Sequence, residues 1–249
     1  MREGMPSRTA RHVAAYRLGY PRIPSAVGDP EADDRLASDV AAGVEGERNP
    51  GMGRYLRFRT AFFDRVVVNG LDRGITQVAV LGAGYDGRAL RYAKPGVRWF
   101  EVDHPATQGD KRDRMARLAI TSPDLTFVAA DLVHDDVAAA LTAEGFAPDV
   151  PSLLLCEGLV VYLAPDVVAT LLARLRSIAA AGTRLALSTR VPGADPVRRQ
   201  HFAERVAGEG EPFALGDADV PAMLAAARWR PAELSEGAQR TGMVVGVPV

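Results

Sequence analysis

Five short apolar runs alternate with helical patterns along most of the chain. The runs occupy residues 77–81, 97–102, 125–129, 152–156 and 184–188. Each has the length and continuous apolar character of a strand that is buried on both faces of a parallel sheet. The clearest helical pattern, over residues 165–181, begins with proline, is followed by Gly182 and places its apolar residues on one stripe. Repeated alternation of this kind predicts a doubly wound α/β fold.

The two ends of the chain depart from this alternation. Residues 1–58 contain several prolines and glycines, and only short helical patterns such as residues 8–18, for which Ser7 is a candidate N-cap. We expect a helical cap segment there, with a loop near residues 43–53, followed by the main domain at residues 59–249. That domain begins with a helix that ends at Gly70 or Gly74.

After residue 189 the rhythm changes. Residues 195–208 and 218–227 have helical patterns, and residues 229–234 and 241–247 have the pattern of two strands joined by a turn. The expected sheet therefore has seven strands. It is mostly parallel and closes with an antiparallel C-terminal hairpin.

Composition narrows the class of protein. The 249 residues carry 30 Lys and Arg against 31 Asp and Glu, so the net charge of −1 argues against a general electrostatic grip on nucleic acid or anionic membrane. No segment has the pattern of a signal peptide or of a membrane-spanning helix, and we expect a cytoplasmic protein. The single cysteine, Cys156, excludes a disulfide framework and a Cys-rich zinc site. We predict no metal site, and we interpret Cys156 as a small buried residue rather than a nucleophile.

Candidate binding residues stand where the strands end. Ligands of open parallel sheets bind beyond the carboxyl ends of the strands. The first strand leads into Gly82-Ala83-Gly84-Tyr85-Asp86-Gly87, which satisfies the spacing G-x-G-x-x-G. That spacing fits sites for NAD, FAD and S-adenosylmethionine alike, and a purely structural turn is the alternative.

Acidic residues end three further strands. Asp103 follows Gly82 at the distance expected of an acid that binds ribose hydroxyls; Glu101 on the same strand face and helix capping ahead of His104 are the alternatives. Asp131 is placed to accept the exocyclic amine of an adenine, with Leu132 against the ring. N-capping, for which Asp135 and Asp136 compete, is the alternative there. Glu157 ends the fourth strand.

These motifs together resemble the leucine carboxyl methyltransferase-like branch of S-adenosylmethionine-dependent methyltransferases, which includes bacterial enzymes acting on natural products. The resemblance extends from about residue 8 to the C-terminus. It rests on R-T-A-F-F-D at residues 59–64, the glycine-rich loop with Asp86 and Arg88, E-V-D-H-P at 101–105, D-L at 131–132 and C-E-G-L at 156–159. Gly87 stands where the family commonly has threonine, and Lys111 where it has lysine or arginine.

The resemblance implies a Rossmann-like class I methyltransferase fold and a cofactor, S-adenosylmethionine, whose product is S-adenosylhomocysteine. It implies that Arg59 holds the cofactor's carboxylate, Asp103 the ribose, Asp131 and Leu132 the adenine, and Glu157 the amino group. The full cofactor-binding set predicted in this way is Arg59, Gly82, Ala83, Gly84, Asp86, Asp103, His104, Asp131, Leu132, Glu157 and Gly158.

The expected reaction is O-methylation of a small-molecule acceptor in bacterial secondary metabolism. An ionised carboxylate acceptor needs no general base, only a group that orients it, whereas a hydroxyl acceptor favours a nearby histidine. The positioning candidates are Tyr162, Tyr16, Tyr20 and His201. No nucleic-acid or membrane partner is expected, and a homodimer stays open.

Two alternatives remain at this point. The glycine spacing also fits an NAD(P)-dependent oxidoreductase, although no Tyr-x-x-x-Lys pair occurs in the chain. A non-catalytic cofactor-binding partner protein is the second alternative.

Overall fold

The computed structural model describes residues 5–44, 49–189, 200, 203–204, 207, 213–216, 218–232 and 242–249. In chain order the helices are α1 (Arg8–Arg17), α2 (Pro30–Ala41), α3 (Pro50–Asp72), α4 (Arg88–Arg91), α5 (Pro105–Arg117), α6 (Val137–Ala143), α7 (Pro165–Ser177) and α9 (Val220–Ala226), with a 3-10 turn at Val160–Tyr162. The strands are β1 (Gln77–Leu81), β2 (Arg98–Asp103), β3 (Leu125–Ala129), β4 (Leu153–Cys156), β5 (Arg184–Ser188), β6 (Trp229–Pro231) and β7 (Met243–Pro248).

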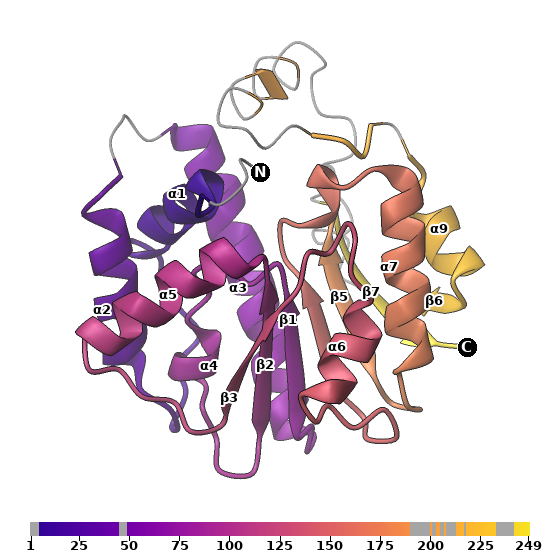
Figure 1. Ribbon diagram of the computed structural model, residues 1–249, viewed down its shortest axis with the longest axis horizontal. Helices are drawn as coiled ribbons and strands as arrows, with labels where there is room; N and C mark the ends of the chain where they lie inside the picture. Colours follow the sequence, from indigo (N-terminus) through magenta and orange to yellow (C-terminus); the bar gives the residue numbers. More distant parts are fainter. Residues whose placement is uncertain are drawn as a thin grey trace.

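One seven-stranded sheet organises the molecule (Figure 1). Its strand order is β3-β2-β1-β4-β5-β7-β6; β1 to β5 are parallel, and β7 runs antiparallel to both β5 and β6. The expected doubly wound, mostly parallel sheet with an antiparallel C-terminal hairpin is therefore confirmed. Three of the five predicted parallel strands have the predicted limits. The strand β2 begins and ends one residue later than expected, and β4 begins one residue later.

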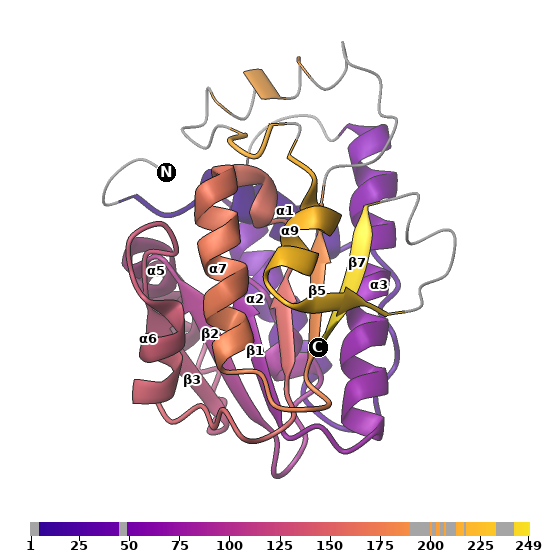
Figure 2. The same cartoon turned by 90° about the vertical axis from the view of Figure 1, so that its right-hand side faces the viewer.

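The central strands β1 and β4 are buried throughout, and because successive side chains of a strand point to opposite sides, both faces of the sheet are covered there. Val78 and Val80 of β1 pack against α3, whereas Ala79 and Leu81 pack into the cluster formed with α6 and α7. Figure 2 shows the sheet between α3 and α7. This two-sided burial explains why the strands appeared in the sequence as continuous apolar runs.

The leading segment begins as the sequence predicts. Ser7 is the N-cap of α1, and its hydroxyl accepts the amide hydrogen of Ala10 at 3.0 Å. The loop predicted near residues 43–53 ends earlier than expected, because Asn49 is already the N-cap of α3 and Pro50 occupies the first turn of that helix. The helix α3 then continues without a break across the expected boundary between residues 58 and 59 and ends at Asp72, just before Gly74.

The other helix ends are partly as expected. The helix predicted for 165–181 ends at Ser177, and α9 covers most of the predicted 218–227. Most of the predicted helix at 195–208 lies outside the described residues. Among the helices that the structure describes, none has the length and apolar character needed to cross a membrane.

Candidate functional site

The strand order reverses between β1 and β4, since β2 lies on one side of β1 and β5 on the far side of β4. Doubly wound sheets bind their ligands at the carboxyl ends of the strands beside such a reversal. The loops after β1, β2 and β4 carry most of the predicted binding residues. The topology therefore brings to one edge of the sheet residues that are far apart in the sequence.

The glycine-rich loop after β1 is tied to the end of β2. The amide of Gly84 donates to Oδ2 of Asp103 at 2.6 Å, and the amide of His104 donates to Oδ1 at 2.7 Å. Burial raises the pKa of the Asp103 carboxyl group against the effect of these two donors. The two hydrogen bonds fix the Asp103 side chain, while the lone pairs left on its oxygens can accept further donors. Asp103, the last residue of β2, is thus held at the carboxyl edge of the sheet, where the sequence placed it.

Both predicted glycines of this loop are required by their surroundings. Gly82 and Gly84 have φ of +63° and +52°, a region that side-chain-bearing residues rarely adopt. A Cβ atom on Gly82 would lie 2.9 Å from the side chain of Leu159, and one on Gly84 would lie 2.9 Å from Ala10 of α1. Ala83, buried between them, donates its amide hydrogen to the carbonyl of Val102. The loop therefore lies directly under α1.

Glu157, directly after β4, is surrounded by guanidinium groups. Arg59 Nε donates to Oε1 at 2.9 Å, Arg88 Nη1 donates to Oε2 at 2.6 Å, and Arg17 Nη2 lies 3.1 Å from Oε2. Burial alone would raise the pKa of Glu157, but Arg88, Arg17 and Arg59 hold it well below its usual range. Glu157 is therefore a carboxylate, and Arg59, predicted to lie in the same site, is its direct partner.

Gly158 lets Arg59 approach the strand end closely. Its φ is +65°, and a Cβ atom there would lie 2.7 Å from Nη1 of Arg59. The amide of Gly158 donates to the hydroxyl of Ser188 at the end of β5, at 2.7 Å. A side chain at this position would push Arg59 away from Glu157.

Asp86 and Asp64 complete the cluster beneath Glu157. Arg88 donates from Nη1 to Asp86 Oδ2 at 2.5 Å and from Nε to Asp64 Oδ1 at 2.7 Å. Arg22 donates two further hydrogen bonds to Asp64. Burial opposes ionisation of Asp64, yet Arg88 and Arg22 lower its pKa to about 2. The cluster of Arg17, Arg22, Arg59 and Arg88 with Asp33, Asp64, Asp86 and Glu157 thus has four positive and four negative groups. Arg91 and Asp34 form one further pair that is attached to it at Asp33.

Glu101, the alternative to Asp103, has a different partner. Lys111 Nζ donates to its Oε2 at 2.5 Å and also to the carbonyl oxygen of Asp86 at 2.5 Å. The Glu101 carboxylate is therefore bound by Lys111 in the interior of the protein, whereas Asp103 lies at the carboxyl edge of the sheet. This arrangement also gives Lys111, to which the sequence assigned no role, a defined place.

The loop after β3 is more open. Asp131 is half-buried, and its Oδ1 accepts the amide hydrogen of Val133 at 2.9 Å, which closes a local turn. Asp136, not Asp131, is the N-cap of α6, so helix capping does not account for Asp131. Leu132 packs partly buried against the cluster on the α6 and α7 face.

Two of the candidate positioning tyrosines connect the leading segment to α3. The hydroxyl of Tyr16 donates to the carbonyl oxygen of Asn49 at 3.4 Å, and that of Tyr20 donates to the carbonyl oxygen of Gly53 at 2.9 Å. Tyr162 packs on Phe213 with ring centroids 5.1 Å apart. His201 lies outside the described residues.

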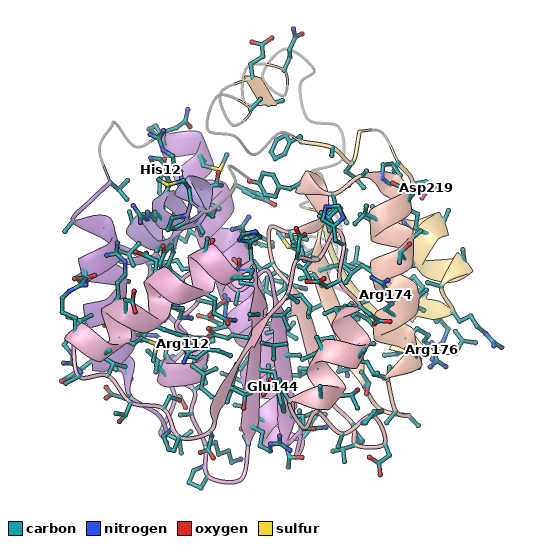
Figure 3. The ribbon with its side chains drawn as sticks, viewed as in Figure 1. His12, Arg112, Glu144, Arg174, Arg176 and Asp219 are labelled. Atoms are coloured by element: carbon teal, nitrogen blue, oxygen red, sulfur yellow. The ribbon has the colours of Figure 1, made fainter. Side chains whose placement is uncertain are left out.

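The side chains of His104, His12 and Cys156 have local surroundings that define them. His104 is the N-cap of α5, and its Nδ1 accepts the amide hydrogen of Ala106. His12, on α1 in Figure 3, hydrogen-bonds the carbonyl oxygen of Arg8. Burial raises the pKa of the Cys156 thiol to about 12, so a thiolate nucleophile is disfavoured.

Sequence reasoning missed part of this site. It gave no role to Arg17, Arg22 or Asp33, because the leading segment contains many arginines and acids with no spacing that separates buried from exposed ones. Asp64 and Arg88 were inside recognised motifs, and that was the available signal. In the described part of the chain, no group of three or more His, Cys, Asp and Glu side chains is placed to hold a metal ion.

Comparison with known proteins supports the fold and places the chain in a family. A protein of Mycobacterium avium named "Putative S-adenosyl-L-methionine-dependent methyltransferase" is 36% identical over 180 residues, which is 71% of this chain; the chain spans 57% of that protein's length. A DUF574 family protein from Streptomyces avermitilis shares the fold with a TM-score of 0.64 at 16% identity, covering 98% of each chain.

Magnesium protoporphyrin IX methyltransferase from Synechocystis, solved with bound S-adenosylhomocysteine, has a TM-score of 0.56 at 16% identity, over 83% of this chain and 90% of that one. At such identities the likeness concerns the fold, which is that of class I methyltransferases. The sequence profile of the leucine carboxyl methyltransferase family matches residues 19–176, which includes the glycine-rich loop, Asp103 and Glu157. The chain therefore belongs to the leucine carboxyl methyltransferase family.

Proposed function

We propose that this protein is an S-adenosylmethionine-dependent O-methyltransferase that methylates a carboxylate or hydroxyl of a small-molecule acceptor in bacterial secondary metabolism. The observation that carries the proposal is the carboxyl edge of β1, β2 and β4. There the Gly84–Asp103 hydrogen bond and the Arg59–Glu157 pair lie beside the reversal of strand order. Family membership and the name of the Mycobacterium avium relative support S-adenosylmethionine-dependent methyl transfer.

The charges of the site suit the amino-acid end of this cofactor. That end is a zwitterion, with an ammonium group for Glu157 and a carboxylate for Arg59. Since the cluster around Glu157 has equal numbers of positive and negative groups, a zwitterion can enter without leaving an uncompensated buried charge. Asp103 would accept the ribose hydroxyls, and Asp131 with Leu132 would hold the adenine.

The protein's contribution to methyl transfer is to orient the reactants and to exclude water. When bound, the sulfonium supplies an electrophilic methyl group, whose carbon–sulfur bond breaks as the carbon–oxygen bond to the acceptor forms. A carboxylate acceptor is ionised at neutral pH and gives up no proton, so only a donor that orients it is required. We propose Tyr162, Tyr16 and Tyr20 as groups that face the acceptor.

The NAD(P)-dependent oxidoreductase is the alternative that the glycine spacing favours. The sheet argues against it, because dinucleotide-binding sheets have the order 3-2-1-4-5-6. Here the antiparallel β7 is inserted between β5 and β6.

Ligand binding separates these alternatives. Isothermal titration with S-adenosylhomocysteine, NAD⁺ and NADP⁺ should show binding of S-adenosylhomocysteine alone; binding of a nicotinamide nucleotide alone would overturn the proposal. Transfer of isotopically labelled methyl groups to a panel of small acids and phenols, followed by mass spectrometry, then tests catalysis. Cofactor binding without transfer to any acceptor would favour the non-catalytic partner protein.

Asp103→Ala tests the site itself. The variant loses the group proposed to bind the ribose, and we expect its affinity for S-adenosylhomocysteine to fall by at least about 100-fold, which corresponds to ~2.7 kcal/mol. Asp124→Ala is the matched control, because Asp124 is exposed and precedes β3 at the opposite end of that strand. Circular dichroism of both variants checks the fold. An Asp103→Ala protein with unchanged affinity would remove Asp103 from the site.

A further inference from the structure

A residue of the leading segment occupies space beside the cofactor loop. Asp33 of α2 is 4% exposed, and its Oδ2 accepts hydrogen bonds from Arg22 Nη1 at 3.0 Å and Arg91 Nε at 2.6 Å. A Cβ atom built on Gly87 would lie 1.7 Å from Oδ1 of Asp33 and 2.3 Å from its Cγ. The first distance is little more than the ~1.5 Å of a carbon–carbon bond. Asp33 therefore fills the place that a side chain at position 87 would take.

The backbone conformation does not require glycine at position 87. Its φ of −107° and ψ of 10° are accessible to residues with side chains. This distinguishes it from Gly82 and Gly84, whose φ values are positive. The contact with Asp33 is what requires glycine here.

The same carboxylate is connected to the arginine cluster. Arg22 bridges Asp33 and Asp64, with Nη1 on the former and Nε on the latter at 2.7 Å. Asp64 in turn accepts Arg88 Nε, and Arg88 donates to Glu157. Asp33 thus acts on the residues that flank Gly87 from two sides: by direct contact with the loop and through Arg22 and Asp64.

We propose that Asp33 is a positioning residue for the cofactor loop, and that its carboxylate fills the space that a side chain at position 87 would occupy. The inference rests on the proposed function, because it assigns to α2 the placement of Asp86 and Arg88 against Glu157. It predicts that Asp33 and Gly87 depend on each other.

A cycle of four proteins tests this dependence: the wild type, Asp33→Ala, Gly87→Thr and the double variant. Titration calorimetry gives the affinities for S-adenosylhomocysteine and for 5′-methylthioadenosine, which has the same nucleoside without the amino-acid portion. We expect each single change to weaken S-adenosylhomocysteine binding by about tenfold or more, or ~1.4 kcal/mol. Binding of 5′-methylthioadenosine should stay within about twofold of the wild type.

The double variant should recover S-adenosylhomocysteine affinity to within about threefold of the wild type, because threonine then fits the space that Asp33 leaves. Arg22 keeps Asp64, and Arg91 keeps Asp34, so neither guanidinium is left unpaired. Asp33→Asn combined with Gly87→Thr should not recover, since asparagine keeps the bulk of the side chain. Asp34→Ala is the matched control: the neighbouring carboxylate is bound to the same Arg91 but is 63% exposed, and its loss should leave the affinity unchanged.

Two results would overturn the inference. The first is a double variant whose loss of S-adenosylhomocysteine affinity equals the product of the two single losses, since this would show that residues 33 and 87 act independently. Equal losses for both ligands would indicate a general structural role. A single variant that does not fold can be tested by melting temperature instead. The inference then predicts that the Asp33→Ala and Gly87→Thr double variant folds again, whereas the Asp33→Asn and Gly87→Thr combination does not. A wild type that binds no S-adenosylhomocysteine would refute the proposed function, while the melting temperatures of the cycle would still report the contact.

Discussion

At the scale of single residues, buried charges placed in pairs dominate this site. Lys111 shows the principle: it is 1% exposed and joins Glu101 of β2 to the carbonyl oxygen of Asp86. Burial raises the pKa of Glu101 to about 7 even with this ammonium group beside it. The free-energy cost of removing the Glu101 carboxylate from water therefore exceeds the electrostatic stabilisation that Lys111 provides.

The pH dependence of stability should report this carboxyl group. Because its pKa in the folded protein, about 7, exceeds its ordinary value of 4.5, the folded protein binds the proton more tightly than the unfolded chain does. This contribution is fully present below pH ~4.5 and is lost as the pH rises through ~7. Relative to Glu101→Gln, the wild type should lose up to about 3 kcal/mol of unfolding free energy over that range.

Urea unfolding of both proteins at a series of pH values measures the difference. Glu144→Gln serves as the control, since Glu144 is exposed at the C-terminal end of α6 (Figure 3). A difference between wild type and Glu101→Gln that does not vary with pH would show that the pKa of Glu101 is the same in the folded protein and in the unfolded chain, which contradicts this prediction.

At the scale of elements, glycines decide how closely helices approach the sheet. Gly70 lies within α3 where that helix packs on β4, and a Cβ atom there would meet the side chain of Leu153 at 2.6 Å. Gly109 lies within α5 with open space around it. The sequence offered Gly70 as a possible helix end and gave no role to Gly109, and it does not show which of the two tolerates a side chain, because that depends on what lies opposite.

The pair gives a prediction of opposite signs. Gly70→Ala should destabilise the protein by about 1–3 kcal/mol, because the added methyl group forces α3 away from β4. Gly109→Ala should stabilise it by up to about 1 kcal/mol, because alanine is the better helix former and meets nothing. Thermal unfolding of both variants is the measurement. A stabilised Gly70→Ala protein would mean that Leu153 moves aside at little cost.

At the scale of the whole molecule, the leading segment is packed into the main body. Leu36 and Val40 of α2 are fully buried in one cluster with Tyr85, Leu90 and Met115. The same segment supplies Arg17, Arg22 and Asp33 to the charged cluster. We infer that α1 and α2, which lie in the segment expected to form a helical cap, fold as one unit with the main domain.

Truncation tests this inference. A protein that begins at Asn49 keeps all of α3 and lacks α1 and α2, so Asp64 loses Arg22, Glu157 loses Arg17 and the apolar cluster is exposed. We expect loss of the cooperative thermal transition, followed by circular dichroism. A truncated protein that melts cooperatively near the melting temperature of the full chain would contradict the inference, because it would show that α1 and α2 are dispensable for folding.

The sequence by itself determined the order of the elements, the parallel sheet with its C-terminal hairpin, and the strand-end residues Gly82, Gly84, Asp103 and Glu157. These follow from local periodicity and from what stands next to each strand in the chain. Only the tertiary structure decided that Arg17, Arg22 and Asp33 belong to the same cluster as Arg59 and Glu157, and that Gly87 is a glycine because of Asp33. The physical reason is that a buried ion pair is defined by its partner, and here the partners are separated by tens of residues of chain.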